Sequence, residues 1–222
     1  MINNELEKRI VTSMFLFLSS LFLILINELI FIFSIFAISV ICFHEWNDIN
    51  KPFFFNKKKR VMLIIRLSGF VYIFIFFISS LFVYKIMGDI FFIYVILVCS
   101  FSDIGGFVFG KIIGGKKLTR ISPNKTISGT VGSFIFSLIA LIIFNSQTYF
   151  DFDYSLTFKN ISFCLIISLS NQLGDLIISY FKRLNKVKNT GDLLPGHGGL
   201  LDRIDGIILA LPVSTILIII MF

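Results

Sequence analysis

The chain has 222 residues, of which 56% are hydrophobic, 29 are phenylalanine and only 15% are charged, with a formal net charge of +7. A soluble domain of this length needs far more polar surface to cover its core, so this composition excludes an ordinary soluble protein. The apolar residues come in continuous runs without two-residue alternation, which argues against a transmembrane β-barrel. The composition therefore predicts an all-α, polytopic transmembrane helical bundle without a separate soluble module.

About seven apolar runs are candidates for crossing the membrane, because a helix needs about 20 residues to span a hydrocarbon core of ~30 Å. In chain order they are Val11–Ile26, Leu29–Phe43, Val61–Tyr84, Ile90–Phe109, Gly129–Phe144, Ile161–Phe181 and Ile204–Phe222. The residues before the first run lack a small-residue cleavage site, so we expect the first helix to be retained.

The first two runs are short, and only Asn27 and Glu28 separate them. They form either a tight hairpin or one long bent helix, and we favour the hairpin. A polar turn at the outer interface accounts for Glu28, whereas a carboxylate within the membrane would call for a functional explanation.

The distribution of Lys and Arg predicts that the polar loops face the cytoplasm. With seven spans and the N-terminus inside, the outside loops hold only Lys85 and Lys159, and Arg66 lies within a span. Every other basic residue falls in an inside segment, as the positive-inside rule requires. The same charges could also attract anionic headgroups or phosphates at the cytoplasmic face.

Two polar segments, residues 102–133 and 174–206, contain most of the 15 glycines together with several acidic residues, a mixture that a simple spacer does not need. In the second segment, PGHGG at residues 195–199 can turn sharply and let the backbone approach a ligand closely. The same segment carries donors suited to phosphate oxygens: Lys182, Arg183, Lys188 and Arg203. Carboxylates, a glycine loop and basic side chains together indicate phosphoryl or nucleotidyl transfer.

The acidic residues of the second segment are candidate metal ligands. Asp175 lies near the end of an apolar helix, with Ser179 and Lys182 on the same face. Asp202 and Asp205 are three residues apart at the start of the last helix and should also share a face. Because hard cations take oxygen ligands, three carboxylates converging from two helices would suit Mg²⁺.

The first segment begins with Asp103 at the end of an apolar run, with Gly106 and Gly110 on its face. Close helix packing explains these glycines as well as a functional role does. Further on, Lys125 and Thr126 precede Gly129 at a helix start. Backbone amides there could bind an anion, and a turn with a helix cap is the alternative.

The stretch SYFKRLNKVKNTGDLLPGHGGLLDRID, Ser179 to Asp205, resembles the signature of phosphatidate cytidylyltransferases, also called CDP-diacylglycerol synthases. The matching parts are Ser179, Lys182-Arg183, Lys188, the PGHGG turn and Asp202-Arg203-Ile204-Asp205. Three stretches upstream are similar to further family motifs: Gly174-Asp175-Leu176, Asp103 to Lys111, and Ser122 to Gly129. The resemblance covers the C-terminal half in order and extends in the N-terminal half only to Glu45-Trp46.

Two positions depart from the family pattern. Asn189 stands where the family usually has Asp, and Ser128 stands where it usually has Glu. The resemblance divides the chain into N-terminal transmembrane helices at residues 1–100 and a catalytic transmembrane region at residues 101–222.

By this resemblance, the chain is expected to make CDP-diacylglycerol and diphosphate from CTP and phosphatidate of the bilayer, in phospholipid biosynthesis. The expected cofactor is Mg²⁺, with a second cation left open. The expected location is a bacterial inner (plasma) membrane, with the active site facing the cytoplasm. Membrane lipids are further expected partners, nucleic acid is not expected, and a homodimer is left open.

The resemblance also assigns roles to individual residues. Asp175, Asp202 and Asp205 are expected to bind the metal. His197 would hydrogen-bond a phosphate or shape its loop, and the phosphate charge would be offset by Lys182, Arg183, Lys188 and Arg203. The nucleotide or the lipid head would be held by Asp103, Ser122, Lys125, Thr126, Gly198 and Gly199.

Two alternatives remain open from the sequence. A CTP-dependent lipid or polyprenol kinase would share the membrane, Mg²⁺ and phosphates, but would transfer the γ-phosphoryl group. A non-catalytic transporter or scaffold would use the intramembrane acids as an ion path, and predicts inverted repeats that the sequence does not show.

Overall fold

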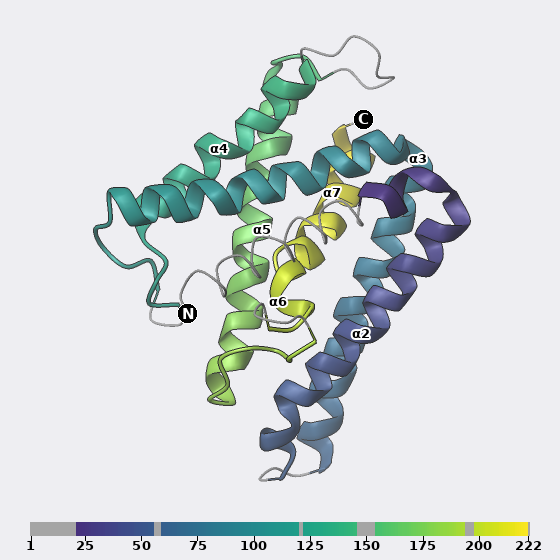
Figure 1. The fold of residues 1–222 in the computed structure, drawn as a ribbon, viewed down its shortest axis with the longest axis vertical. Helices are drawn as coiled ribbons and strands as arrows, with labels where there is room; N and C mark the ends of the chain where they lie inside the picture. The colour runs from purple at the N-terminus through teal and green to yellow at the C-terminus, as the bar shows by residue number, and fades with distance from the viewer. Residues whose placement is uncertain (1–20, 56–58, 120–121, 146–153, 194–197, 222) are drawn as a thin grey trace, which may run out of the picture. The chain divides into compact units, whose positions relative to one another are not determined.

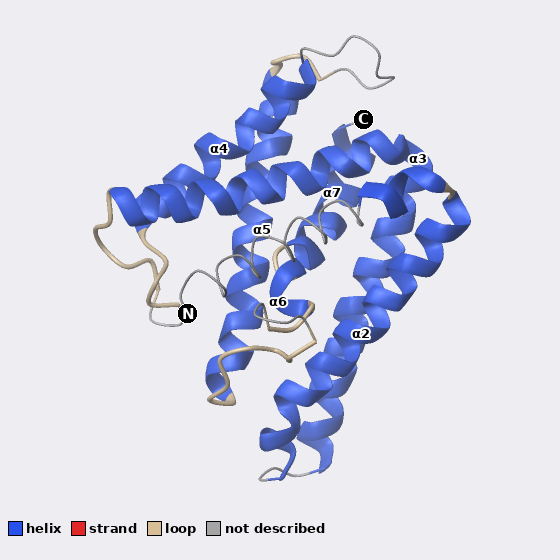
Figure 2. Ribbon diagram, viewed as in Figure 1, coloured by secondary structure: helices blue, strands red, loops and turns tan. Residues whose placement is uncertain are grey.

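The structure, a computed structural model, describes residues 21–55, 59–119, 122–145, 154–193 and 198–221 (Figure 1). These residues form helices joined by loops (Figure 2). The helices with complete bounds are α2 (Glu28–Phe55), α3 (Lys59–Ile112), α4 (Ile127–Asn145), α5 (Phe158–Leu184), α6 (Leu201–Ile204) and α7 (Ile207–Met221). The prediction of an all-α, polytopic membrane protein is confirmed.

Within the described ranges, four helices are long and apolar enough to cross a membrane: α2 over Glu28–Lys51, and the whole of α3, α4 and α5. Helix α7 is apolar but shorter. The predicted runs coincide with these helices, and α3 carries two of them. The first predicted run lies mostly outside the described residues, so the number of spans and the side of the loops stay predictions.

Helix α3 is interrupted at Gly88, where φ is 85° and ψ is 171°. Essentially only glycine adopts such torsions. Apart from its two chain neighbours and the helix backbone within four residues, no atom of the described residues lies within 4 Å of the position that a Cβ would occupy there. The interruption therefore depends on backbone torsion and separates the predicted runs Val61–Tyr84 and Ile90–Phe109.

The chain packs as two compact units. The first unit comprises residues 1–77 and 181–204, and the second comprises residues 78–180 and 205–222. This division by packing is separate from the functional division predicted at residue 100, which stays a prediction.

In the first unit, Asn27 ends one helical stretch and begins the next. Residues 21–26 are helical, Asn27 is not, and α2 follows at once. The Asn27 side-chain oxygen accepts a hydrogen bond from the Leu29 amide (2.9 Å), and its carbonyl accepts one from the Phe31 amide (3.0 Å). This is an N-cap. It excludes one continuous helix through this point and is consistent with the favoured hairpin, whose first arm lies mostly outside the described residues.

Helix α2 continues to Phe55, whereas the predicted run ended at Phe43. The extension is stable because its polar and aromatic residues have partners. The Trp46 indole donates a hydrogen bond to the Ile65 carbonyl of α3 (3.1 Å) and lies against Gly69, where a Cβ would overlap the indole ring. Helix α2 thus packs closely along the first part of α3 (Figure 1).

In the second unit, α3 and α4 approach closely through glycines. Gly106 and Gly110 of α3 lie against Gly129 of α4, and Gly105 lies against Gly132. The alternative that these glycines serve close helix packing is confirmed, since a Cβ at most of these positions would meet backbone of the facing helix.

We expect Gly105→Ala to lower the free energy of unfolding by about 1–3 kcal/mol, as overpacking typically does. The added Cβ would overlap the Gly132 carbonyl oxygen, a backbone atom that cannot rotate away. Thermal unfolding of the purified variant in detergent measures the effect. Ile104→Ala, at the neighbouring 49% exposed position, is the control, and equal midpoints for the two variants would contradict this account of the packing.

Polar pairs join α3 to α5 inside the second unit. The Ser102 and Ser168 hydroxyls are 2.8 Å apart, and the Tyr94 hydroxyl is 2.8 Å from the Cys164 sulfur. Each pair gives its polar groups a hydrogen-bond partner. Burying these groups among apolar side chains without a partner would cost free energy. These pairs fix α5 against α3 in the region from which the candidate site extends.

The start of the last helix differs from the prediction. Asp202 lies in the short α6, Asp205 follows that helix, and α7 begins only at Ile207. The expectation that both carboxylates share a face of one helix is wrong. The reason is tertiary, because Gly206 packs against Asn171 and Gly174 of α5 so closely that a turn replaces the helix.

Candidate active site

A cleft of about 330 Å³ opens in the second unit between α3, α4 and α5. Its walls include charged, hydroxyl and glycine residues in place of the apolar side chains that cover most of these helices. The residues around it are Asp103, Gly106, Phe107, Ser122, Asn124, Lys125, Thr126, Gly129, Thr130, Ser133, Gln172 and Asp175. Five of the predicted site residues therefore meet in one place: Asp103, Ser122, Lys125, Thr126 and Asp175.

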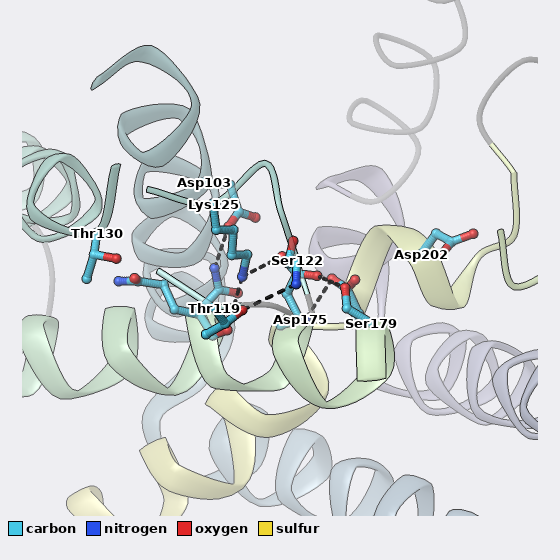
Figure 3. Close-up of polar contacts among 12 residues, drawn as sticks. Asp103, Thr119, Ser122, Lys125, Thr130, Asp175, Ser179 and Asp202 are labelled. Atoms are coloured by element: carbon cyan, nitrogen blue, oxygen red, sulfur yellow. Dashed lines mark hydrogen bonds and ion pairs between the residues drawn. The ribbon is translucent and has the colours of Figure 1, made fainter. Parts of the chain in front are cut away.

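An ion pair crosses this cleft. The Lys125 Nζ lies 2.7 Å from Asp175 Oδ2 and 3.2 Å from the Gln172 carbonyl oxygen (Figure 3). Both side chains of the pair are partly exposed, at 24% and 33%. A ligand can therefore reach either charge from solvent.

The loop before α4 holds Lys125 in place. The Leu118 amide donates to the Lys125 carbonyl (2.8 Å), and the Lys125 amide donates to the Ser122 carbonyl (3.1 Å). Thr126 then caps α4, because its hydroxyl accepts from the Gly129 amide (3.1 Å). The helix-cap alternative for this segment is thus confirmed, and the Thr126 oxygen already has a donor.

Asp175 lies within α5 and not near its end, since the helix continues to Leu184. As predicted from the helical spacing, the Ser179 hydroxyl shares its face and donates to Asp175 Oδ1 (3.0 Å) (Figure 3). The Asp205 side chain also interacts with the Asp175 carboxylate. Asp175 is therefore surrounded by Lys125, Ser179 and Asp205.

Asp103 projects from α3 into the same cleft. The Asn171 side-chain amide of α5 donates a hydrogen bond to Asp103 Oδ1 (2.7 Å), which fixes the carboxylate on one side. Asp103 also interacts electrostatically with Asp175 and Lys125. Sequence reasoning missed Asn171, although its amide, four residues before Asp175 and on the same helical face, was a visible signal.

In the first unit, a second polar cluster forms around Asp202. The Lys182 Nζ donates to Asp202 Oδ1 (2.7 Å), and these side chains are only 11% and 10% exposed. Asp202 Oδ2 accepts from the backbone amides of Thr190 (2.7 Å) and Gly199 (3.2 Å). Both carboxylate oxygens are therefore engaged by groups of the glycine-rich segment and of α5.

The end of α5 explains how the chain returns toward Asp202. Lys186 has φ of 55°, its amide donates to the Arg183 carbonyl (3.1 Å), and the Val187 amide donates to the Lys182 carbonyl (3.0 Å). These two bonds make a Schellman motif, which normally places glycine at the position of Lys186. The motif stops the helix directly after Lys182 and Arg183.

Sequence reasoning also missed the role of Glu45. This carboxylate of α2 is only 6% exposed and accepts hydrogen bonds from Thr190, Leu200 and Leu201. Its signals were a lone acidic residue at the end of an apolar run and the short resemblance at Glu45-Trp46. These signals say nothing of partners so distant in the chain.

The remaining predicted site residues that the structure describes lie outside the cleft lining. Arg183, Lys188 and Arg203 are exposed, and Gly198 and Gly199 lie beside Asp202. His197 lies outside the described residues. Among the residues that the structure does describe, no group of three or more His, Cys, Asp or Glu side chains is arranged to hold a metal ion. The metal assignment of Asp175, Asp202 and Asp205 stays a prediction.

Comparison with known proteins supports the resemblance seen in the motifs. A family model described as the cytidylyltransferase family matches residues 52–221. The phosphatidate cytidylyltransferase of Staphylococcus saprophyticus is 43% identical over 128 residues, which make up 57% of this chain and 48% of that protein. That of Staphylococcus aureus is 44% identical over 129 residues, again 57% and 48%.

The chain spans about half the length of the curated relatives it matches. The matched part of the family model nevertheless includes the cleft around Lys125 and Asp175 and the cluster around Asp202. The family model matches well more than half of the residues of this chain. The chain therefore belongs to the cytidylyltransferase family.

Proposed function

We propose that this protein transfers the cytidylyl group of CTP to phosphatidate at a membrane surface, producing CDP-diacylglycerol and diphosphate. The observation that carries the proposal is the cleft in which Lys125, Asp103 and Asp175 lie beside hydroxyl groups and a helix N-terminus. The apolar helices around it suit a lipid substrate, and the family membership supports the nucleotide substrate.

In the proposed reaction, a phosphate oxygen of phosphatidate attacks the α-phosphorus of CTP. A new P–O bond forms, the bond from the α-phosphorus to the oxygen bridging to the β-phosphorus breaks, and diphosphate leaves. No general base is needed, because a phosphate oxygen is already ionised at neutral pH. The protein therefore acts by positioning two phosphate groups and offsetting their charge.

Lys125 is the residue best placed for this task in the cleft. Its ammonium group is held by Asp175 and by the Gln172 carbonyl, and it is partly open to solvent. A phosphate oxygen could join or replace one of these acceptors without moving the backbone. The phosphate-binding roles of the exposed Arg183, Lys188 and Arg203 stay predictions from the sequence, and Lys182 is committed to Asp202.

The carboxylates of the second unit fit Mg²⁺ by their chemistry, since Asp175 and Asp205 are hard oxygen donors that interact with each other, and Asp103 lines the same cleft. We propose that Asp175 and Asp205 hold the ion, and Asp202 stays a further ligand predicted from the sequence. When bound, Mg²⁺ supplies charge neutralisation for the phosphates. We also propose that the site faces the cytoplasm of a bacterial inner membrane, where CTP is available.

The proposal is tested with detergent-solubilised protein, CTP labelled at the α-phosphate, and phosphatidate in mixed micelles. We expect an organic-soluble labelled lipid and one diphosphate per lipid, both abolished by EDTA and restored by Mg²⁺. A lipid kinase would instead release labelled CDP into the aqueous phase when given diacylglycerol. Either that result or the absence of any CTP-dependent product would overturn the proposal.

A further inference from the structure

The carboxylate of Glu45 binds a segment that is distant in the sequence. Glu45 Oε1 accepts a hydrogen bond from the Leu200 amide (2.9 Å), and Oε2 accepts from the Thr190 hydroxyl (2.9 Å) and the Leu201 amide (2.8 Å). At 6% exposure this carboxylate has little contact with solvent, so these donors must replace water. Two of the three are backbone groups, which a substitution of the donor residue would not remove.

Glu45 and Asp202 divide the donors of this segment between them. Asp202 takes the backbone amides of Thr190 and Gly199, and Glu45 takes the Thr190 hydroxyl and the next two amides. Three consecutive amides, from Gly199 to Leu201, therefore end on two carboxylates. Thr190 is held through its backbone and through its side chain, so both ends of the stretch between Thr190 and Gly199 are fixed.

The packing around Glu45 is tight as well as polar. A Cβ at Gly199 would overlap the Thr190 hydroxyl and the Glu45 carboxylate, and a Cβ at Gly191 would lie 3.1 Å from Glu45 Oε1. Next to Glu45, Trp46 fixes α2 on α3 through Gly69 and the Ile65 carbonyl. The helix that carries Glu45 is therefore packed tightly on α3, and the Glu45 carboxylate directly contacts the backbone at Gly191 and Gly199.

We propose that Glu45, which lies outside the stretch 52–221 matched by the family model, is a positioning residue for cytidylyl transfer. This inference rests on the proposed function. Glu45 acts through Thr190 and the backbone of Gly199–Leu201, which it holds in the conformation that presents these residues and the neighbouring basic residues to phosphate groups. Precise placement of such groups contributes strongly to rate, and small misplacements are costly.

The first test is Glu45→Gln. An amide has one oxygen, so its nitrogen must face either the Leu200 amide or the pair formed by Thr190 and Leu201, and at least one hydrogen bond is lost. We expect kcat/KM for CTP to fall about 10–100-fold, the loss typical of groups that orient catalytic residues. Asp48→Asn, one turn further along α2 at an exposed ion pair, is the matched control and should behave as the wild type.

A pair of variants at Thr190 keeps the test decisive if Glu45→Gln fails to fold. Thr190→Val removes the hydroxyl that Glu45 binds and should lower kcat/KM, whereas Thr190→Ser keeps the hydroxyl and should restore it. Because both changes break the same hydrogen bond, the double variant Glu45→Gln/Thr190→Val should lose less than the product of the single losses. Wild-type kinetics for Thr190→Val would overturn the proposal whether or not Glu45→Gln folds, and strictly multiplicative losses in a folded double variant would overturn it as well.

Amide hydrogen exchange separates this inference from the proposed function. Peptides that contain Gly199–Leu201 should exchange faster in Glu45→Gln than in the wild type, while peptides from α4 should not change. If the wild type makes no CDP-lipid but exchange still responds, the proposed function fails and the positioning by Glu45 stands. Unchanged exchange at Gly199–Leu201 in a folded Glu45→Gln variant would refute the positioning itself.

Discussion

Replacing Asp175 with asparagine is expected to lower the rate of CDP-diacylglycerol formation by more than about 100-fold, since partners that merely orient metal ligands already contribute about 10–100-fold. The amide keeps the size of the side chain, but its single oxygen can accept from only one of Lys125 and Ser179, which bind different carboxylate oxygens in the structure. It removes the negative charge that a hard cation requires. Turnover of the purified variant, measured over a range of Mg²⁺ concentrations, checks the expectation.

If Asp175 only held Lys125 in place, Asp175→Asn and Lys125→Met would show the same Mg²⁺ dependence of turnover. If Asp175 binds the metal, the two variants differ. Lys125→Met removes the ammonium group but leaves the carboxylate, so it should raise the KM for CTP or phosphatidate while preserving the Mg²⁺ dependence. The exposed Asp48→Asn should match the wild type in both respects. Near-normal turnover of Asp175→Asn, or the same Mg²⁺ dependence in both cleft variants, would show that Asp175 is not a metal ligand.

Lys182→Met is expected to lower the free energy of unfolding by about 3–5 kcal/mol, as the loss of one partner of a buried ion pair does. Lys182 Nζ lies 2.7 Å from Asp202 Oδ1, and the two side chains are 11% and 10% exposed. Without the ammonium group, the Asp202 charge stays buried with only the Thr190 and Gly199 amides to stabilise it. The midpoint of thermal unfolding in detergent should fall clearly below that of the wild type.

A second ion pair of the chain serves as a control, because its N–O distance is the same but its side chains are exposed. Lys51 and Asp48 also lie 2.7 Å apart, but they are 62% and 36% exposed, so Lys51→Met should change stability by no more than about 1 kcal/mol. The double variant Lys182→Met/Asp202→Asn removes both buried charges and should recover part of the lost stability. Equal shifts for Lys182→Met and Lys51→Met would contradict the importance of burial.

The helices and much of the cleft could be predicted from the sequence because their causes are local. Apolar runs of sufficient length are helical in a membrane, and every predicted run within the described residues coincides with a helix. The pairing of Asp175 with Ser179 follows from helical spacing alone. The motifs around Lys125 also predicted a common binding site for that residue and Asp103, and both residues line one cleft.

The parts that could not be predicted depend on contacts between distant segments. Glu45 is separated from Thr190 by 145 residues and from Leu201 by 156, so no local pattern connects them. The break between Asp202 and Asp205 arises because Gly206 packs on Asn171, which is again a tertiary cause. Continuing α2 past Phe43 likewise required the partners of Glu45 and Trp46 to be known.

The backbone at Gly88 in α3 restricts the chirality of the residue at this position but not the volume of its side chain. Its torsions, φ 85° and ψ 171°, lie in a region closed to L-residues, yet the space beside its α-carbon is open among the described residues. The mirror image of these torsions is ordinary extended backbone for an L-residue. A D-alanine introduced there by chemical ligation would therefore fit as readily as glycine, whereas L-alanine, with an identical volume, would force the two halves of the helix to reorient.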